Sequence, residues 1–195
     1  LHDVWYSEDG EHWIEATSGS GPEGKGLAAL GKRAEHACFS LDGKLWLVGG
    51  AHEPKVNGDI WWTTDGSHWT KAVDEAPFGT VTGHHIVNVN DEVLLVGGQT
   101  PWTDRERGGD GEKIWASTDG IVWHPYLAWE SNGGSVWKPN NFVWNAKSAW
   151  DRLENSEVVA LDGMVWALGP PLHWVGMNNK VWMFDPTQAQ ADPIP

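Results

Sequence analysis

Several residue types are scarce in this sequence, and each scarcity excludes a class of protein. A single cysteine, Cys38, excludes an internal disulfide and a paired-cysteine metal site, and we expect it to be a small buried side chain on a strand. The 13 basic residues stand against 27 acidic ones, a formal net charge of -14, which argues against nucleic-acid binding because that requires clustered Lys and Arg. No run of 18 apolar residues occurs, so we expect no membrane span.

Tryptophan and glycine, in contrast, are abundant. The 195 residues include 16 Trp and 24 Gly, a composition that favours many short strands and turns within about one domain. Three stretches share the pattern Trp, three residues, Asp-Gly, two residues, Trp: "VWYSEDGEHW" from Val4, "IWWTTDGSHW" from Ile60 and "IWASTDGIVW" from Ile114. This spacing is therefore a repeat, and repeats decide architecture before local propensities do.

A second pattern alternates with the first. "HACFSLDGKLWLVGG" ends at Gly49-Gly50, and "HHIVNVNDEVLLVGG" ends 48 residues later at Gly97-Gly98. A third copy, "SEVVALDGMVWALGP", keeps Gly169 but not the His or the second Gly. Each copy predicts two strands joined by a two-residue turn, at Asp42-Gly43, Asn90-Asp91 and Asp162-Gly163. We expect equally tight Asp-Gly turns within the Trp repeats, at Asp9-Gly10, Asp65-Gly66 and Asp119-Gly120.

Four strands per unit of about 50 residues predict the blades of a β-propeller. The paired tryptophans would lie between neighbouring blades, where large aromatic side chains fill the space between sheets. They are Trp5 and Trp13, Trp61 and Trp69, and Trp115 and Trp123. The Gly pairs would end strands at places where backbones crowd and no side chain fits.

The combined pattern of His, apolar strand, Gly-Gly, Asp-Ile-Trp, Asp-Gly and Trp resembles kelch repeats, in particular the kelch-type repeats of bacterial proteins. Arg33 matches the usual arginine ahead of the histidine, whereas Val81 and Leu153 do not. The resemblance implies an all-β, kelch-like propeller, and a secreted, periplasmic or cell-surface location. Leu1 suggests a processed or trimmed start, from which no location can be read. The expected segments are a half blade (1–17), two blades (33–73 and 81–127), a Trp-rich insertion (128–153), a degenerate blade (154–186) and a tail (187–195).

About three blades do not close a ring of four to eight. One interpretation is a homodimer, in which the outer strands at the start of one copy and the inner strands at the end of another complete each other. The alternatives are a piece of a larger or multi-chain propeller and an open arc with exposed sheet edges.

The long loops are the expected place of function, because variable loops on a rigid scaffold carry most binding sites. The loops after the second strand and between blades should emerge at the same end of the sheets: 51–58, 99–112, 170–179, 18–32, 74–80 and 128–149. Trp129, Trp137 and Trp144 are candidates for a sugar-stacking platform or a protein hot spot, with packing of the loop or of a dimer interface as the alternative. The candidates on the second loop are Trp102, Arg105 and Arg107, which could instead form a solvated salt-bridged loop.

Metal binding and copper-dependent oxidation have little support in the sequence. The histidines show no short metal-ligand spacing: His12 and His68 belong to turns, and His36 and His84 should be buried framework residues. We therefore expect no metal and no cofactor. A copper oxidase of the galactose oxidase kind uses a tyrosine crosslinked to a cysteine, and Tyr6, Tyr126 and Cys38 are a poor basis for it.

Two functional hypotheses follow. The first is a non-enzymatic recognition or scaffold module that binds a glycan or protein partner through the long-loop face. The alternative is a carbohydrate-active enzyme of the mutarotase, lyase or oxidase type with a central polar pocket. Candidate members of that pocket are Arg33, Arg105, Arg107, His85 and Glu106.

Overall fold

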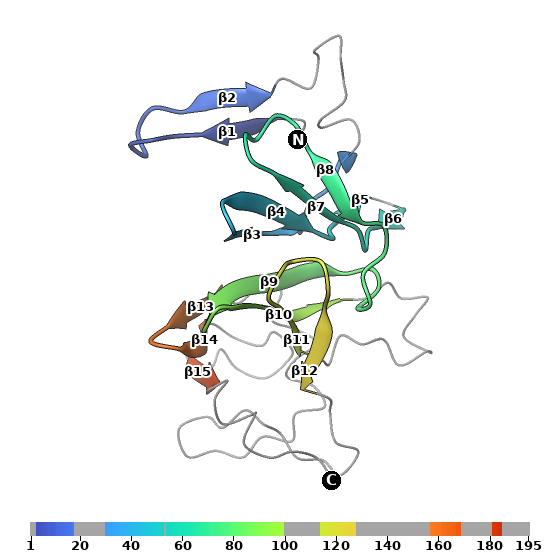
Figure 1. The fold of residues 1–195 in the computed structure, drawn as a ribbon, viewed down its shortest axis with the longest axis vertical. Helices are drawn as coiled ribbons and strands as arrows, with labels where there is room; N and C mark the ends of the chain where they lie inside the picture. Colours follow the sequence, from blue (N-terminus) through green and yellow to red (C-terminus); the bar gives the residue numbers. More distant parts are fainter. Residues whose placement is uncertain are drawn as a thin grey trace, which may run out of the picture. The chain divides into compact units, whose positions relative to one another are not determined.

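The fold is seen in a computed structural model that describes residues 3–17, 30–52, 54–99, 114–127, 157–168 and 181–184. All the elements that it describes are β-strands, in several small antiparallel sheets, so the all-β prediction is confirmed (Figure 1). The chain forms two compact units, Leu1–Thr82 and Gly83–Pro195.

The first unit is built on a four-stranded sheet whose strands follow each other in chain order. They are β3 (Ala37–Leu41), β4 (Lys44–Val48), β7 (Ile60–Thr63) and β8 (Thr70–Val73). A separate hairpin pairs β1 (Val4–Tyr6) with β2 (Ile14–Thr17), and a small one pairs β5 (Ala51–His52) with β6 (Lys55–Val56). The two Trp-repeat hairpins of this unit, β1–β2 and β7–β8, thus have the same antiparallel pairing.

The second unit contains two sheets. The four-stranded one consists of β9 (Thr82–Val89), which starts at the boundary between the units, β10 (Glu92–Gln99), β11 (Ile114–Ser117) and β12 (His124–Leu127). The three-stranded one consists of β13 (Glu157–Leu161), β14 (Met164–Leu168) and β15 (Val181–Phe184). The order of strands is again that of the chain, as a series of antiparallel neighbours.

Each sheet has two distinct faces, which we name from the repeats. The face that carries the first Trp of a repeat is the Trp face, and the opposite one is the back face. In the first unit Leu47 and Trp61 are cross-strand partners on the Trp face, and Val4 of β1 packs against them. At the back face the rings of Phe39 and Trp46 stack with their centroids 5.8 Å apart.

The core of the second unit repeats this arrangement of faces. The back face of the four-stranded sheet contributes Val87, Leu94 and Ala116, which cluster with Val165 and Ala167 of β14. Ala167 precedes Gly169 by two residues, as Leu47 of the Trp face precedes Gly49, so the β14 residues of this cluster lie on the equivalent Trp face of the three-stranded sheet. Burial of such apolar clusters is the main stabilising contribution in a sheet protein.

Three of the predicted turns are confirmed. Both central residues have positive φ, as a type I′ turn requires. The values are 51° and 70° at Asp42-Gly43, 49° and 64° at Asn90-Asp91, and 52° and 74° at Asp162-Gly163.

The prediction of equally tight turns in the Trp repeats is wrong. Six residues separate Thr63, the end of β7, from Thr70, the start of β8. Thr63 Oγ1 accepts hydrogen bonds from the backbone N of Asp65 and of Gly66 at 3.2 and 3.0 Å. Asp65 Oδ1 in turn accepts two bonds of 2.8 Å from the backbone N of the second and third residues after it. Side-chain oxygens therefore stabilise a longer loop, which competes with the two-residue turn.

Two burial predictions also differ from the structure. Cys38 is exposed, although its neighbours Ala37 and Phe39 on β3 are buried on the opposite face of the strand. Trp61, Trp69, Trp115 and Trp123 are buried as expected. Their counterparts in the β1–β2 hairpin, Trp5 and Trp13, are instead exposed to 48% and 60%.

The expected completion of strands between two copies depends on which strand edges of the last described sheet have no partner. It required a free edge on the inner strands at the end of the chain, beside β14. In the structure β15 pairs with that edge of β14 through four residue pairs, from Val165↔Phe184 to Leu168↔Val181. β14 thus has a partner on both sides, β13 and β15, so completion of this sheet by another copy would have to use β15, which has a single partner among the described strands.

Candidate recognition surface

Three segments of the first unit meet at one end of its sheet. Ala34 and Ala51 exchange two backbone hydrogen bonds of 2.8 Å, and the N of Gly50 donates to the O of Val81 at 2.8 Å. This confirms, within the first unit, that the loop after the second strand and the loop after the fourth lie together. We call this region the loop-end surface, made of residues 33–36, 49–52, 54–59 and 76–82.

Gly50 is the residue that allows these segments to approach. Its φ is +92°, and a Cβ placed on it would lie 2.8 Å from the O of Ala34 and 2.8 Å from the Cβ of His36. Asn57 binds Gly50 twice, since its backbone N and its Nδ2 both donate to the O of Gly50, at 2.9 and 3.0 Å. The predicted crowding at the Gly pair is therefore confirmed at Gly50, and the junction is rigidly hydrogen-bonded.

A buried ion pair adjoins this junction. Arg33 Nη1 is 2.7 Å from Asp59 Oδ1, and the guanidinium also donates to the O of Leu30 and of Gly49. Trp61 Nε1 donates to Asp59 Oδ2 at 2.7 Å. Burial by itself raises the pKa of Asp59, but the hydrogen bonds from Arg33 and Trp61 outweigh it, so the pKa lies below its ordinary value.

This network overturns one part of the enzyme hypothesis. Arg33 was a candidate for a substrate-binding pocket, yet its side chain is buried and its donors are directed to protein acceptors. It ties the start of the sheet to the Asp-Ile-Trp segment that begins at Asp59. Arg33 is thus a structural residue and not a ligand for a substrate carboxylate.

The exposed polar side chains of the loop-end surface are Glu35, His36, His52 and Lys55. Glu35 has a φ of 56°, rare for a residue with a Cβ, and its Oε2 accepts a 2.7 Å hydrogen bond from Thr82 Oγ1. The pKa of His36 is lowered by partial desolvation and by the nearby Arg33 guanidinium. An exposed imidazole and an exposed carboxylate on one surface offer hydrogen-bonding groups to a ligand.

His36 departs from its predicted burial, whereas its repeat counterpart His84 does not. His84 is 4% exposed within β9, which starts at Thr82. β3 starts only at Ala37, so His36 precedes the strand and reaches solvent. The same residue type at the same repeat position therefore has two environments, and a difference in strand length explains it.

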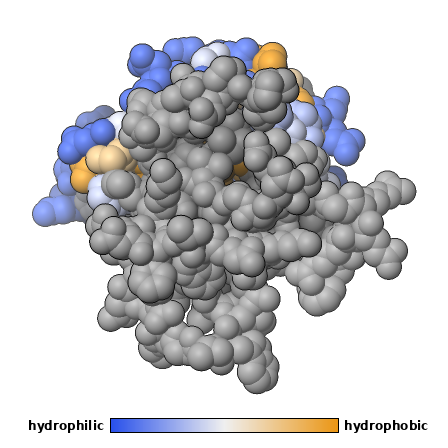
Figure 2. Space-filling view, turned by 90° about the horizontal axis from the view of Figure 1, so that it is seen from below, coloured by the Kyte–Doolittle hydropathy of each residue, from blue (hydrophilic) through white to orange (hydrophobic). Residues whose placement is uncertain are grey.

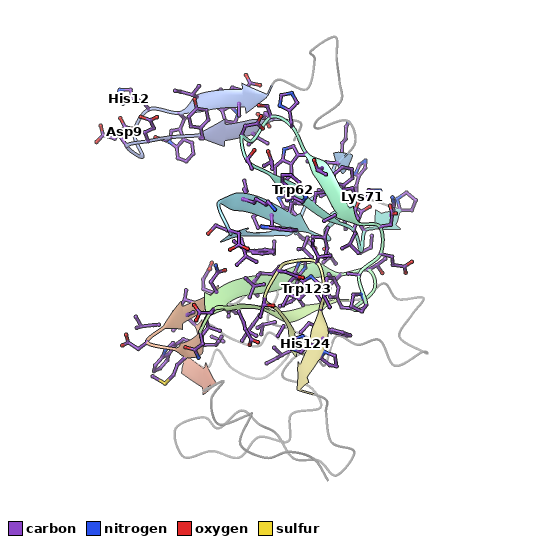
Figure 3. All side chains as sticks on the ribbon, in the orientation of Figure 1. Asp9, His12, Trp62, Lys71, Trp123 and His124 are labelled. Carbon is purple, nitrogen blue, oxygen red and sulfur yellow. The ribbon has the colours of Figure 1, made fainter. Side chains whose placement is uncertain are left out.

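The Trp-repeat loops carry exposed Asp–His pairs. His12 Nδ1 lies 2.7 Å from Asp9 Oδ2, and His68 Nδ1 lies 2.8 Å from Asp65 Oδ2. Bonds from the backbone N and the side chain of the histidine lower the pKa of both Asp residues. Figure 3 shows Asp9 and His12 together at the tip of the loop between β1 and β2. The assignment of His12 and His68 to turns is confirmed.

The remaining site predictions fall largely outside the described residues. These are Trp102, Arg105, Glu106, Arg107, Trp129, Trp137 and Trp144. His85 lies on β9 and is half-buried. Sequence reasoning missed the role of Glu35, because its left-handed backbone leaves no signal in the sequence. The Arg33–Asp59 pair did leave a signal in the sequence, since both residues belong to the repeat pattern.

Within the described parts of the chain, no group of three or more His, Cys, Asp or Glu side chains is arranged to hold a metal ion. The same parts contain no helix of the length and apolarity needed to cross a membrane. No protein-family model matches this chain, and no curated protein matches it significantly.

Proposed function

We propose that this protein is a non-enzymatic recognition module, a kelch-like propeller segment that binds a glycan or protein partner through the long-loop end of its sheets. The proposal is supported by the way in which the loop-end surface is built. Gly50, Asn57 and Val81 join its loops by backbone hydrogen bonds, while Glu35, His36 and His52 stay exposed above them. A rigid base with polar side chains on it is the usual form of a binding surface on a repeat scaffold.

The propeller interpretation adds to this proposal. Both four-stranded sheets have the strand order of a propeller blade, and the sheets of the second unit pack face to face. In such a fold the loop ends of successive blades line one face, so the loops with Trp102, Trp129 and Trp137 would extend the same surface.

The first experiment is a glycan array probed with the fluorescently labelled chain, followed by titration of the best oligosaccharide. The test variant is the double substitution His36→Ala and His52→Ala. We expect it to weaken binding at least about tenfold, because the removal of hydrogen-bonding side chains from a binding site typically costs that much affinity.

The matched control is His12→Ala with His68→Ala, which removes two exposed histidines from the Trp-repeat loops. It should bind like the unsubstituted chain. An array with no binding would contradict the glycan form of the proposal. Equal losses in both double variants would contradict the loop-end surface as the site.

A further inference from the structure

The β1–β2 hairpin exposes two tryptophans whose repeat counterparts are buried. Trp5 and Trp13 are 48% and 60% exposed, whereas Trp61 and Trp69 are only 5% and 8% exposed. Trp5 nevertheless has the same local structure as Trp61, since each indole Nε1 donates to the carboxylate two residues earlier, at 3.0 and 2.7 Å. The hairpin is thus folded like its counterpart, but within the part of the chain that the structure describes its Trp face has no comparable cover.

The chain itself shows what covers such a face. In the first unit the Trp face with Trp61 receives Val4, which belongs to the back face of the β1–β2 hairpin. Gly66 makes the contact close, because a Cβ on it would lie 3.3 Å from Ala16 Cβ. In this unit a Trp face therefore packs against the back face of the sheet that precedes it in the chain.

The second unit follows the same rule. Val158, Val165 and Ala167 on the Trp face of the three-stranded sheet pack against the back face of the preceding sheet, at residues such as Leu94 and Ala116. The chain thus makes one type of contact twice, Trp face on back face, with different residues. In this protein a Trp face and a back face are therefore complementary surfaces.

A second uncovered face lies on the last sheet. Val159, Leu161 and Leu168 are 43%, 60% and 41% exposed. The register places Val159 opposite Trp166 and Leu161 opposite Met164, so these residues share the back face of β13 and β14. Where Figure 2 shows described residues, hydrophobic surface occurs as small patches among hydrophilic residues.

We infer that the Trp5–Trp13 face of one copy packs on the Val159–Leu161–Leu168 face of a second copy. The contact would be head-to-tail, and it would repeat the Trp-face-on-back-face packing that the chain already makes twice. It differs from strand completion, because it joins the faces of two sheets and not the edges of two strands. It also goes beyond the proposed ligand binding, because it assigns a contact to residues that are not part of the loop-end surface.

The test is light scattering after size exclusion, over a dilution series of four proteins. Trp13→Lys changes the head face and Leu161→Glu the tail face. Val122→Lys is the matched control, since Val122 is 66% exposed on the loop between β11 and β12. We expect the unsubstituted chain and V122K to show a mass of at least two chains of 21.5 kDa each. For W13K and L161E, the concentration at which the complex dissociates should be at least about tenfold higher than for the unsubstituted chain.

Mixing the two interface variants separates head-to-tail from head-to-head contact. A W13K copy keeps its tail face and an L161E copy keeps its head face, so the mixture should form a dimer at a concentration at which each variant alone is monomeric. Far-ultraviolet circular dichroism checks that the variants fold, as expected for exposed positions.

Three outcomes would overturn the inference: a monomeric unsubstituted chain at every concentration, a mass unaffected by W13K or by L161E, or a mixture that stays monomeric. None of these results affects glycan binding at the loop-end surface, so the two proposals fail separately.

Discussion

At the scale of single residues, the most consequential interaction is the pair of Arg33 and Asp59. Both side chains are buried, at 4% and 12% exposure, and Trp61 completes the hydrogen bonding of the carboxylate. A buried pair contributes little net stability compared with apolar packing, but removal of one partner leaves an uncompensated charge. The exposed pair of Lys71 and Asp74, 3.0 Å apart, offers a contrast within the same unit.

Asp59→Ala should therefore lower the free energy of unfolding by about 3–5 kcal/mol. Asp74→Ala should lower it by less than about 1 kcal/mol, because solvent screens an exposed pair. Urea denaturation at neutral pH measures both. Equal effects in the two variants would show that Arg33 finds other partners when Asp59 is absent.

At the scale of elements, glycine acts in two different ways in the hairpins. Gly43 closes the type I′ turn between β3 and β4 with a φ of +70° and no atom within 4 Å of its missing Cβ. Gly50 has a φ of +92° and a crowded Cβ position. The first glycine is needed for backbone conformation alone, and the second for conformation and for close approach.

Gly43→Ala should cost about 1–2 kcal/mol, the penalty of a left-handed backbone for a residue with a Cβ. Gly50→Ala should cost about 2–5 kcal/mol, because overpacking against Ala34 and His36 adds about 1–3 kcal/mol. The difference between the two urea midpoints is the informative quantity. If it were zero, the junction would relax around a methyl group, and its rigidity as a base for binding would be in doubt.

At the scale of the whole molecule, net charge opposes the association of two copies. Each copy carries a formal charge of -14, and Glu15 and Glu157 lie opposite Trp5 and Leu168 in the strand registers, on the two faces concerned. Apolar contact favours the complex, while the acidic residues around it repel each other. Salt screens that repulsion, since the Debye length falls from about 10 Å at 0.1 M to about 3 Å at 1 M.

The association of the unsubstituted chain should therefore strengthen several-fold between about 0.05 M and about 0.5 M sodium chloride. Sedimentation velocity across a dilution series measures the change. Trp13→Lys serves as the control, since it should stay more dissociated than the unsubstituted chain in both buffers. Dissociation on addition of salt would indicate a contact held by ion pairs and not by apolar faces.

How far sequence reasoning reached can be judged from particular residues. The turns at Asp42-Gly43, Asn90-Asp91 and Asp162-Gly163 were predictable, because a type I′ turn depends on a few local backbone angles. The Asp65-Gly66 loop was mispredicted, because hydrogen bonds to the Thr63 and Asp65 side chains compete with the short turn. For the candidate site, the meeting of the loops was predictable from strand alternation, but the position of Glu35 was not.

The sequence by itself determined the strands, their order and the faces on which residues lie, because strand period, turn chemistry and repeat spacing are local properties. Only the tertiary structure decided which equivalent residues are covered. Trp61 and Trp5 share a repeat position, as do His84 and His36, and each pair has one buried and one exposed member. Burial depends on what packs against a face, and a repeat specifies the face but not its neighbour.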